Sequence, residues 1–385
     1  MTGRLSLTLD VSAVPARPGG AGYYTIAVAG GLAARPDVEV SLIARRDDRA
    51  RWLALGDGRA AVSAVVPNWR PGRLAFEQLR FPHLLSSLGV DVHHAPHYTM
   101  PGRSPVPCVV TIHDCTFFDH PEWHVRTKAA FFRRAIRRAA RSAGSLVCVS
   151  EVTAARLRAV VDVRAPIVVA PHGVDHQRFT ATAPGSGDDT ASLDALGIAV
   201  DRPLVAFVGT LEPRKGVAPL IAAFDRVAER HGTAQLVLAG QMGWGLEETE
   251  RALAEARHGD RIIVTGYVPD EAVPALLRAA TVVAYPALEE GFGLPALEAL
   301  ACGAPLVTTE GTAMAEVAQG AAVLVAPGDV DQLAQALDAA LTEGREGAEA
   351  TRRRALGIAV AAERTWAASV ALHLGAYDLA LSGRQ

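Results

Sequence analysis

Short apolar runs rich in Val, Ile and Leu recur along the first half of the chain, each followed by a stretch of helical period. Runs that are apolar throughout and alternate with helices are typical of a parallel sheet covered on both faces. The expected strands are 5–11, 38–44, 61–67, 90–96, 107–113, 145–150 and 166–171. The expected helices between them are 21–34, 72–88, 126–143 and 151–161.

The alternation is interrupted once and then restarts. Residues 179–192, FTATAPGSGDDTAS, are rich in Pro, Gly, Ser, Thr and Asp, which is typical of a linker. Beyond it we expect strands, again separated by helices, at 203–210, 234–240, 261–268, 281–288, 305–309 and 321–327.

The pattern predicts two doubly wound, Rossmann-like α/β domains, 1–178 and 201–363, joined by a linker at 179–200. Trp366, Val370, Tyr377 and Leu381 form one apolar stripe in the last helix, 364–385. We expect this helix to pack back on the first domain. Open α/β sheets bind ligands beyond the carboxyl ends of their strands, so the functional residues are sought there.

Composition narrows the functional classes. A length of 385 residues suits two domains, and a formal net charge of −3 argues against a dedicated nucleic-acid binder. The four cysteines are scattered without metal-binding spacing, and no signal-like segment opens the chain. No apolar stretch approaches the roughly 20 residues of a membrane span. We therefore expect a cytoplasmic protein with no nucleic-acid partner, peripheral at most to the inner face of the cell membrane.

Two adjacent cations follow the first strand of the second half. In FVGTLEPRKGV, residues 207–217, Arg214 and Lys215 stand at a strand–helix turn, and Gly216 allows the backbone to turn tightly. Arg grips a phosphate bidentately, Lys acts as a point charge, and the following helix N-terminus favours an anion. This loop predicts a phosphate site.

A second loop, LEEGFGLPALEALACG (288–303), follows another strand of the same domain. Gly291 and Gly293 allow a ligand to approach the backbone, and Glu298 is expected in the first turn of the following helix. A carboxylate there is suited to a vicinal diol such as a ribose. With Glu290 just before the turn, the two carboxylates are able to reach different parts of one ligand.

EGFGLPALE resembles the E-x7-E signature of the family-4 retaining glycosyltransferases, which have the two-domain GT-B fold. GTLEPRKG is similar to that family's phosphate-binding loop, and VVTIHD, SEVTAARL, PHGVD and GYVPDE resemble its other landmarks in the same order. The resemblance covers nearly the whole chain. TLEPRK and HHAPHYTMP look most like bacterial mannosyltransferases that build surface polysaccharides.

On the donor side, the resemblance implies that Arg214 and Lys215 bind the nucleotide pyrophosphate and that Glu298 binds the ribose hydroxyls. Glu290 would hold the transferred sugar, together with the amides of Gly291, Phe292 and Gly293 and the adjoining Leu294. Some relatives have a basic residue where this chain has Thr210, so the phosphate cations are expected to be Arg214 and Lys215 alone.

Other parts of the site are implied by the same resemblance. Tyr267 and Val268 would border the base, and His113 would point from the first domain toward the sugar and the reacting oxygens. The loop RPGGAGYYT (17–25) would close over the phosphate and the acceptor, with Gly20 and Gly22 in close backbone contact. The remaining histidines are irregularly spaced, so no metal site is expected.

The expected reaction is metal-independent transfer of a hexose with retention of configuration. Its donor is expected to be GDP-mannose, bound as a co-substrate with no resident cofactor, and its acceptor a glycan or a lipid-linked glycan. A UDP-glucose or UDP-N-acetylglucosamine donor is an open alternative, and a nucleotide-sugar epimerase on the same fold is another. A dinucleotide oxidoreductase is disfavoured, because no GxGxxG follows the first strand of either domain.

Residues 125–143, VRTKAAFFRRAIRRAARSA, carry seven Arg or Lys interleaved with Phe131, Phe132 and Ile136. A basic amphipathic helix of this kind is able to dock on anionic lipids. A solvated, arginine-rich helix face is the competing interpretation.

Overall fold

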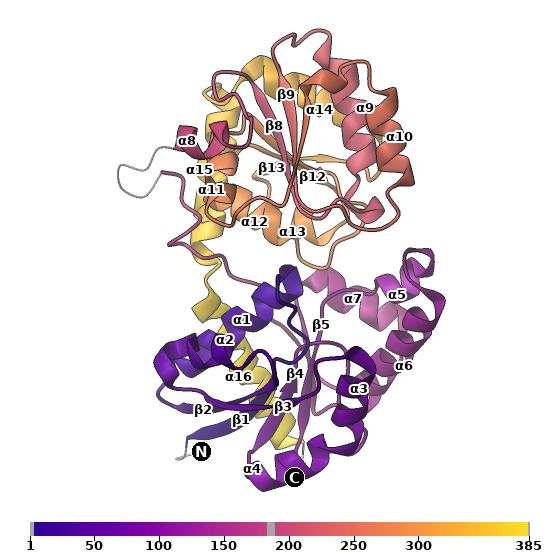
Figure 1. Cartoon of the computed structure of the whole chain (residues 1–385), viewed down its shortest axis with the longest axis vertical. Coiled ribbons are helices and arrows are strands. Elements are labelled where there is room, and N and C mark those ends of the chain that lie inside the picture. The colour runs from indigo at the N-terminus through magenta and orange to yellow at the C-terminus, as the bar shows by residue number, and fades with distance from the viewer. Residues whose placement is uncertain (1–3, 183–188, 384–385) are drawn as a thin grey trace. The chain divides into compact units, whose positions relative to one another are not determined.

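The computed structural model describes residues 4–182 and 189–383, and the chain divides into two compact units (Figure 1). The first unit runs to Gly173 and takes in the chain again from Trp366, whereas the second is Val174–Thr365. Within the described residues, each unit contains one all-parallel sheet, and these have seven and six strands. The predicted fold class, two Rossmann-like α/β domains, is confirmed.

The first sheet has the strand order β3-β2-β1-β4-β5-β6-β7. Its direction of growth reverses beside β1, which places β1 and β4 at the switch point where doubly wound sheets bind ligands. The strands are β1 (Leu5–Asp10), β2 (Val38–Arg45), β3 (Ala61–Val66), β4 (Val92–Ala95), β5 (Cys108–Ile112), β6 (Ser145–Cys148) and β7 (Ile167–Val169). Each lies inside a run that the sequence predicted, apart from a final residue in β2.

The second sheet has the order β10-β9-β8-β11-β12-β13, so its switch point lies between β8 and β11. These are the strands that precede the two loops predicted to bind the donor. The strands are β8 (Leu204–Val208), β9 (Gln235–Ala239), β10 (Ile262–Gly266), β11 (Val282–Tyr285), β12 (Leu306–Thr309) and β13 (Ala322–Val325).

Helices cover the first sheet on both faces (Figure 1). They are α1 (Gly20–Ala33), α2 (Arg49–Leu53), α3 (Arg70–Leu79), α4 (Phe81–Leu88), α5 (Thr116–Asp119), α6 (Arg126–Ser142), α7 (Glu151–Val160) and α16 (Trp366–Ser382), with 3-10 turns η1 (Leu55–Gly58) and η2 (Pro121–Trp123). The single helix expected at 72–88 is two helices, because Pro82 lacks the N–H that a continuous helix would require.

The second unit has the same layered design. Its helices are α8 (Asp189–Asp194), α9 (Val217–Ala228), α10 (Glu247–Glu255), α11 (Ala272–Ala279), α12 (Leu294–Ala301), α13 (Ala313–Ala318), α14 (Val330–Glu343) and α15 (Ala348–Glu363), with η3 (Pro213–Lys215) and η4 (Gly259–Arg261). The segment expected to be a linker contains α8, which an ion pair of 2.7 Å between Arg278 and Asp189 holds to α11. Residues 183–188 of that segment lie outside the described residues.

The C-terminal helix α16 packs within the first unit, where Val370 and Tyr377 join the buried core. Its close approach depends on small residues opposite it. A Cβ placed on Gly31 of α1 would come within 2.7 Å of Val370, and one on Gly144 within 2.8 Å of Ala380. None of the described helices is long and apolar enough to cross a membrane.

A buried chain of hydrogen bonds also fastens α16. His373 Nδ1 donates to the Ser369 carbonyl at 2.7 Å, so the Nε2 of the neutral ring accepts from the Tyr24 hydroxyl, also at 2.7 Å. Tyr24 in turn accepts from the Thr111 hydroxyl at 2.8 Å. Thr111 accepts from His94 Nε2 at 2.8 Å, and His94 Nδ1 accepts from Tyr377 at 2.9 Å. These side chains join α1, β4, β5 and α16 into one unit.

Candidate functional site

In the second unit, the loops that follow β8 and β9 are joined by their backbones. Leu211 N–H donates to Gln241 O and Gly243 N–H donates to Leu211 O, both at 2.9 Å. The approach is so close that a Cβ on Gly240 would lie 1.8 Å from the carbonyl oxygen of Gly209. The Gly240–Gly245 loop is therefore part of the same surface as the predicted phosphate loop.

Gly216 fixes the turn between η3 and α9. Its φ is +68°, a left-handed conformation that favours glycine, and a Cβ there would lie 2.1 Å from the carbonyl oxygen of Pro286. The loop after β11 is thereby held against the loop after β8, and Leu288 N–H also donates to Arg214 O at 2.8 Å. The N-terminus of α9 is directed to the same place, which favours an anion there.

The two predicted cations meet the first predicted glutamate at this junction. Lys215 Nζ forms an ion pair with Glu290 and donates to the Tyr285 hydroxyl at 2.6 Å. Arg214 Nη1 lies 3.4 Å from the same Glu290 oxygen. The side chain of Lys215 is buried and that of Arg214 is 24% exposed, so Arg214 presents more of its charge to a ligand.

The pKa values reflect this shared charge. Burial, reinforced by Arg214, lowers the pKa of Lys215 from its usual value. Burial alone would raise the pKa of Glu290, but Lys215 and Arg214 outweigh it and hold that pKa below its usual value. Burial raises the pKa of Tyr285 well above its usual range, so its hydroxyl stays protonated. The two cations and the carboxylate of Glu290 are therefore paired as ions at this junction.

Sequence reasoning missed Glu212, the acidic partner of Arg214, and Trp244, which is bonded to Glu212. Glu212 accepts from Arg214 Nε at 2.6 Å through one carboxylate oxygen and from Trp244 Nε1 at 3.1 Å through the other. Glu212 stands within the motif TLEPRK itself, two residues from Arg214. Trp244 lies in the stretch GQMGWG, residues 240–245, whose three glycines indicate close backbone approach.

The helix α12 begins at Leu294 after Gly293, whose φ is +93° and whose added Cβ would meet Met314 at 2.6 Å. Because the helix begins there, Glu298 is its fifth residue and lies in the second turn, not in the first turn as expected. Burial raises the pKa of Glu298 to about 7, although Arg178 opposes the shift. Among the described residues its carboxylate has no hydrogen-bond partner.

The other predicted donor-side residues occupy the same edge of the second sheet. Thr210 is exposed directly after β8, and Tyr267, directly after β10, is 50% exposed. The side chains of Val268, Phe292 and Leu294 are buried, as is Gly291. Of the two residues expected to border the base, only Tyr267 presents its side chain to solvent.

In the first unit, His113 follows β5 and is almost fully buried. Its Nε2 donates to the Pro96 carbonyl at 2.8 Å, so Nδ1 of the neutral ring is the acceptor. Burial lowers its pKa, which keeps the ring neutral. The Tyr24 ring packs edge-on against it, with centroids 5.0 Å apart. The buried hydrogen-bond chain of α16 therefore also supports His113.

The predicted loop at 17–25 is mostly helical, because α1 begins at Gly20. Gly20 is exposed, whereas Gly22 is buried and its added Cβ would lie 2.8 Å from Cβ of Pro18. Gly22 therefore permits a close contact inside the chain itself, and Gly20 opens the helix.

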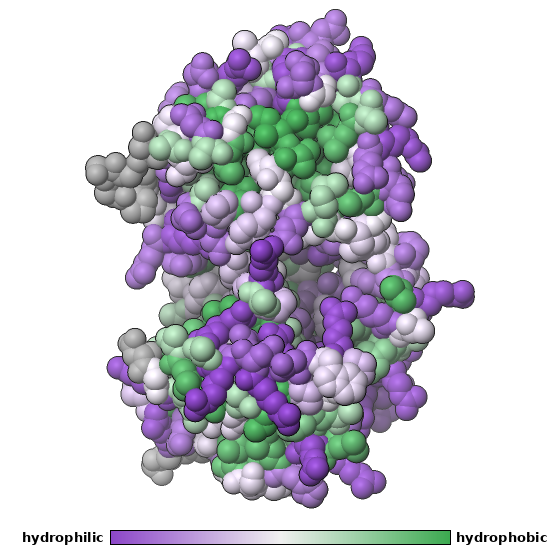
Figure 2. All heavy atoms as spheres, viewed as in Figure 1, coloured by the Kyte–Doolittle hydropathy of each residue, from purple (hydrophilic) through white to green (hydrophobic). Residues whose placement is uncertain are grey.

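The basic helix is present as α6, and it lacks acidic residues. Its buried side includes Ala129, Ile136 and Ala140, while Arg134 and Arg138 are exposed. On the face shown in Figure 2, hydrophilic atoms dominate the region where Figure 1 draws α6, with hydrophobic groups among them. Phe131 is 40% exposed and Val125, just before the helix, is 70% exposed.

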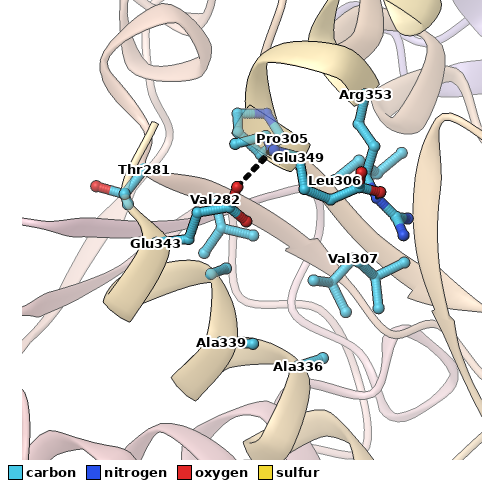
Figure 3. Close-up of a pocket in the computed structure, with 14 residues that line it drawn as sticks. Thr281, Val282, Pro305, Leu306, Val307, Ala336, Ala339, Glu343, Glu349 and Arg353 are labelled. Atoms are coloured by element: carbon cyan, nitrogen blue, oxygen red, sulfur yellow. Dashed lines mark hydrogen bonds and ion pairs between the residues drawn. The ribbon is translucent and has the colours of Figure 1, made fainter. Parts of the chain in front are cut away.

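A pocket of about 200 Å³ in the second unit is a different feature (Figure 3). Its lining includes Val282, Leu306 and Val323, near the amino ends of β11, β12 and β13, so it lies at the opposite edge of the sheet from Arg214. At its rim, Glu343 accepts from the backbone N–H of Glu349 at 2.7 Å (Figure 3). Glu343 thus stabilises the start of α15.

Over residues 4–182 and 189–383, no group of three or more His, Cys, Asp or Glu side chains is arranged to hold a metal ion. Metal independence stays a prediction that chelation tests.

Residues 188–356 match the family model "Glycosyl transferases group 1", and residues 18–178 match "Glycosyltransferase Family 4". The O-antigen chain mannosyltransferase B of Escherichia coli is 28% identical over 75% of this chain and 74% of its own length. The D-inositol 3-phosphate glycosyltransferase of Kribbella flavida is 35% identical, and the match spans 49% of this chain and about half (48%) of that protein.

Among solved structures, the Anabaena protein HepE in complex with UDP-glucose superimposes with a TM-score of 0.74 and 21% identity, covering 97% of this chain and 100% of that chain. That likeness shows the fold alone.

The fold and the family matches define a glycosyltransferase of the GT-B class. The chain belongs to glycosyltransferase family 4, and the resemblance drawn from EGFGLPALE and GTLEPRKG is confirmed. Because both matching family models describe glycosyltransferases, the alternative of a nucleotide-sugar epimerase is not pursued.

Proposed function

We propose that the protein transfers mannose from GDP-mannose to a glycan or lipid-linked acceptor, with retention of configuration and without a metal ion. The observation that carries this proposal is the cluster of Arg214, Lys215 and Glu290 at the switch point of the second sheet. It combines two cations suited to a diphosphate with a carboxylate suited to sugar hydroxyls.

In this proposal the nucleotide diphosphate lies against Arg214 and Lys215. As the bond between C1 of the sugar and the diphosphate oxygen lengthens, negative charge accumulates on the leaving group. Fixed cations at that position stabilise the transition state more than the ground state, which is the role that a divalent cation has in other enzymes. Glu290 is paired with both cations and is displaced or shared when the diphosphate binds.

The acceptor hydroxyl then attacks C1 from the face that the diphosphate leaves, and its proton passes to the leaving phosphate oxygen. Glu290 and the amides of Gly291, Phe292 and Gly293 hold the sugar, and Glu298 accepts hydrogen bonds from the ribose. His113, with its Nδ1 available as an acceptor, orients a hydroxyl near the reacting oxygens. Tyr267 borders the base.

The choice of mannose as the transferred sugar is supported by the similarity to the Escherichia coli O-antigen chain mannosyltransferase B, which aligns over 75% of this chain. A UDP-glucose donor is the alternative, because the fold is shared with HepE, which was solved with UDP-glucose. The D-inositol 3-phosphate glycosyltransferases are relatives with another named acceptor, so a surface glycan or lipid-linked glycan is proposed from the mannosyltransferase resemblance.

A thermal-shift panel tests the donor. GDP and GDP-mannose should raise the melting temperature, UDP and UDP-glucose should not, and EDTA should leave the shifts unchanged. A shift with UDP-glucose alone would replace GDP-mannose as the donor. A shift that EDTA abolishes would overturn metal independence.

The proposed cellular place is the cytoplasm, with peripheral contact between α6 and the inner face of the cell membrane. Exposed arginines beside Val125 and Phe131 match an anionic bilayer, because the charges attract its headgroups while the apolar side chains enter the interface. Co-sedimentation should occur with vesicles containing anionic lipid and should be weak with purely zwitterionic vesicles. Replacement of Phe131 and Arg134 by Ala and Gln should reduce it, and equal sedimentation with both vesicle types would exclude this docking mode.

A further inference from the structure

The loop between β9 and α10 contains the chain's single tryptophan between Val174 and Thr365, Trp244. Trp244 is 42% exposed as a residue, and it lies at the edge of the sheet where Arg214 lies. Its N–H, in contrast, is engaged with Glu212 at 3.1 Å. Trp244 thus donates its N–H to the buried carboxylate of Glu212 while part of the residue stays exposed to solvent.

Glu212 connects this tryptophan to the phosphate cation. One carboxylate oxygen accepts from Trp244 Nε1 and the other accepts from Arg214 Nε at 2.6 Å. The side chain of Glu212 is only 11% exposed, so water competes little for its oxygens. A carboxylate held at one oxygen loses freedom to rotate, and its other oxygen then fixes the guanidinium it contacts.

The guanidinium of Arg214 lies between two carboxylates. Its Nε faces Glu212 at 2.6 Å and its Nη1 faces Glu290 at 3.4 Å. Because the Nε side is held, the Nη side stays directed toward Glu290, where the diphosphate is proposed to bind. Without the hold on Glu212, the guanidinium would follow Glu290 or turn toward solvent.

The backbone around Trp244 is built to keep it there. A Cβ on Gly243 would lie 2.7 Å from Leu211 O, and one on Gly245 would lie 3.0 Å from Pro213. Both glycines therefore allow the tryptophan loop to lie directly on the phosphate loop. The position of Trp244 relative to Glu212 is set by these contacts and does not depend on a ligand.

We infer that Trp244 is a positioning residue for the diphosphate of the donor. It acts through Glu212 on Arg214, and its indole responds to occupancy of the diphosphate position. This inference rests on the proposed nucleotide-sugar site in the second unit, and it adds a specificity element to it: discrimination by phosphate content, independent of the base.

The test compares Trp244→Phe, which keeps an aromatic ring but removes the N–H, with the matched control Trp69→Phe, an exposed tryptophan of the first unit. Calorimetric titration with the preferred nucleoside diphosphate should show about a five- to tenfold loss of affinity for Trp244→Phe, the size of a typical net hydrogen bond, because Trp244 acts on the ligand only through Glu212 and Arg214. Affinity for the corresponding nucleoside should stay within twofold. The control should match the native protein with both ligands.

Two further readouts separate positioning from a general structural effect. In an Arg214→Gln background, Trp244→Phe should cost no further affinity, because the residue it acts through is gone. The tryptophan fluorescence change on adding the diphosphate should persist in Trp69→Phe and disappear in Trp244→Phe. Circular dichroism and melting temperature confirm that each variant is folded, and Glu212→Gln, which removes the charge that holds Arg214, should reproduce the loss if Trp244→Phe is unstable.

The outcomes are distinct. If the native protein binds no nucleoside diphosphate, the proposed donor site is wrong. If the native protein binds and Trp244→Phe binds equally well, the site stands and the positioning role is overturned. If diphosphate and nucleoside affinity fall together, or the loss persists beside Arg214→Gln, Trp244 acts through a different contact and the inference is likewise overturned.

Discussion

Lys215 and Glu290, 75 residues apart in the sequence, form an ion pair at the switch point of the second sheet, where the loops after β8 and β11 meet. The Tyr285 hydroxyl accepts a further hydrogen bond from Lys215. Both side chains are largely buried, so neither charge is solvated well without the other. A substitution of either residue is therefore expected to change both the stability of the second unit and the proposed donor site.

Removing one partner should therefore destabilise the second unit. Lys215→Met leaves Arg214, among the described residues, as the one cation paired with Glu290, and we expect a loss of about 2 kcal/mol in the free energy of unfolding, below the range for fully buried pairs because one cation remains. Urea denaturation at neutral pH measures it. Arg226→Met, which breaks the exposed Arg226–Asp331 pair of the same unit, is the control and should cost no more than about 0.5 kcal/mol. Equal losses in the two variants would show that burial of the pair is unimportant.

Replacing each glutamate of the E-x7-E motif by alanine should affect a different step of the reaction. Glu298→Ala should weaken binding of the donor, because the ribose loses its acceptor, by about tenfold. Glu290→Ala should mainly slow turnover, measured as transfer or as slow donor hydrolysis, by about a hundredfold or more. Glu363→Ala, at an exposed position at the end of α15, is the control. If both site variants affect only binding, the assigned division of roles is incorrect.

Donor binding should depend on pH through Glu298. Burial raises the pKa of Glu298 to about 7, so its carboxyl group is half protonated at neutral pH. The ionised form accepts two hydrogen bonds from a diol more readily, and donor affinity should therefore rise between pH 6 and pH 8. Calorimetry across this range, with Glu298→Gln as the comparison, measures the effect. A native profile as flat as that of the variant would remove Glu298 from the ribose site.

The first unit should lose stability in mild acid. Burial lowers the pKa of His373 to about 4 and that of His93 to about 3, and His94 is also well below its usual value. Because these pKa values are lower in the folded than in the unfolded protein, stability is full above the unfolded pKa of about 6.5 and falls as pH decreases from there. Each such histidine contributes a slope of up to about 1.4 kcal/mol per pH unit.

Thermal denaturation between pH 7.5 and pH 5 checks this expectation. The native protein should melt at progressively lower temperature, and His373→Gln should show a shallower decline although it is less stable at pH 7.5. Its lower stability follows from the loss of the Tyr24 and Ser369 hydrogen bonds. A variant that declines as steeply as the native protein would show that His373 does not titrate on unfolding.

The sequence pattern predicted the strands well, because both sheets are parallel and buried on both faces, which makes each strand a continuous apolar run. Helix ends were predicted less well. The pattern predicts Glu298 one turn too early, because the start of α12 depends on the left-handed conformation of Gly293, which packs against Met314. The helix expected at 72–88 is broken at Pro82, a residue whose effect the helical period concealed.

The site was predictable where its residues follow one another along the chain and not where the sheet brings them together. Arg214 and Lys215 stand in one motif and were found. Trp244 contacts Glu212 because β9 lies beside β8 in the strand order, and that order cannot be read from the hydrophobic pattern. Tyr285 closes over Lys215 for a related reason, since β11 flanks β8 on the other side.

The most direct test of the account is calorimetric titration of GDP-mannose into the native protein and into the Arg214→Gln variant, with UDP-glucose as the competing donor. The account predicts that the native protein binds GDP-mannose in the presence of EDTA, and that the loss of one phosphate-binding guanidinium weakens this binding by about tenfold or more. Native-like binding by Arg214→Gln, or binding of UDP-glucose without GDP-mannose, would contradict it.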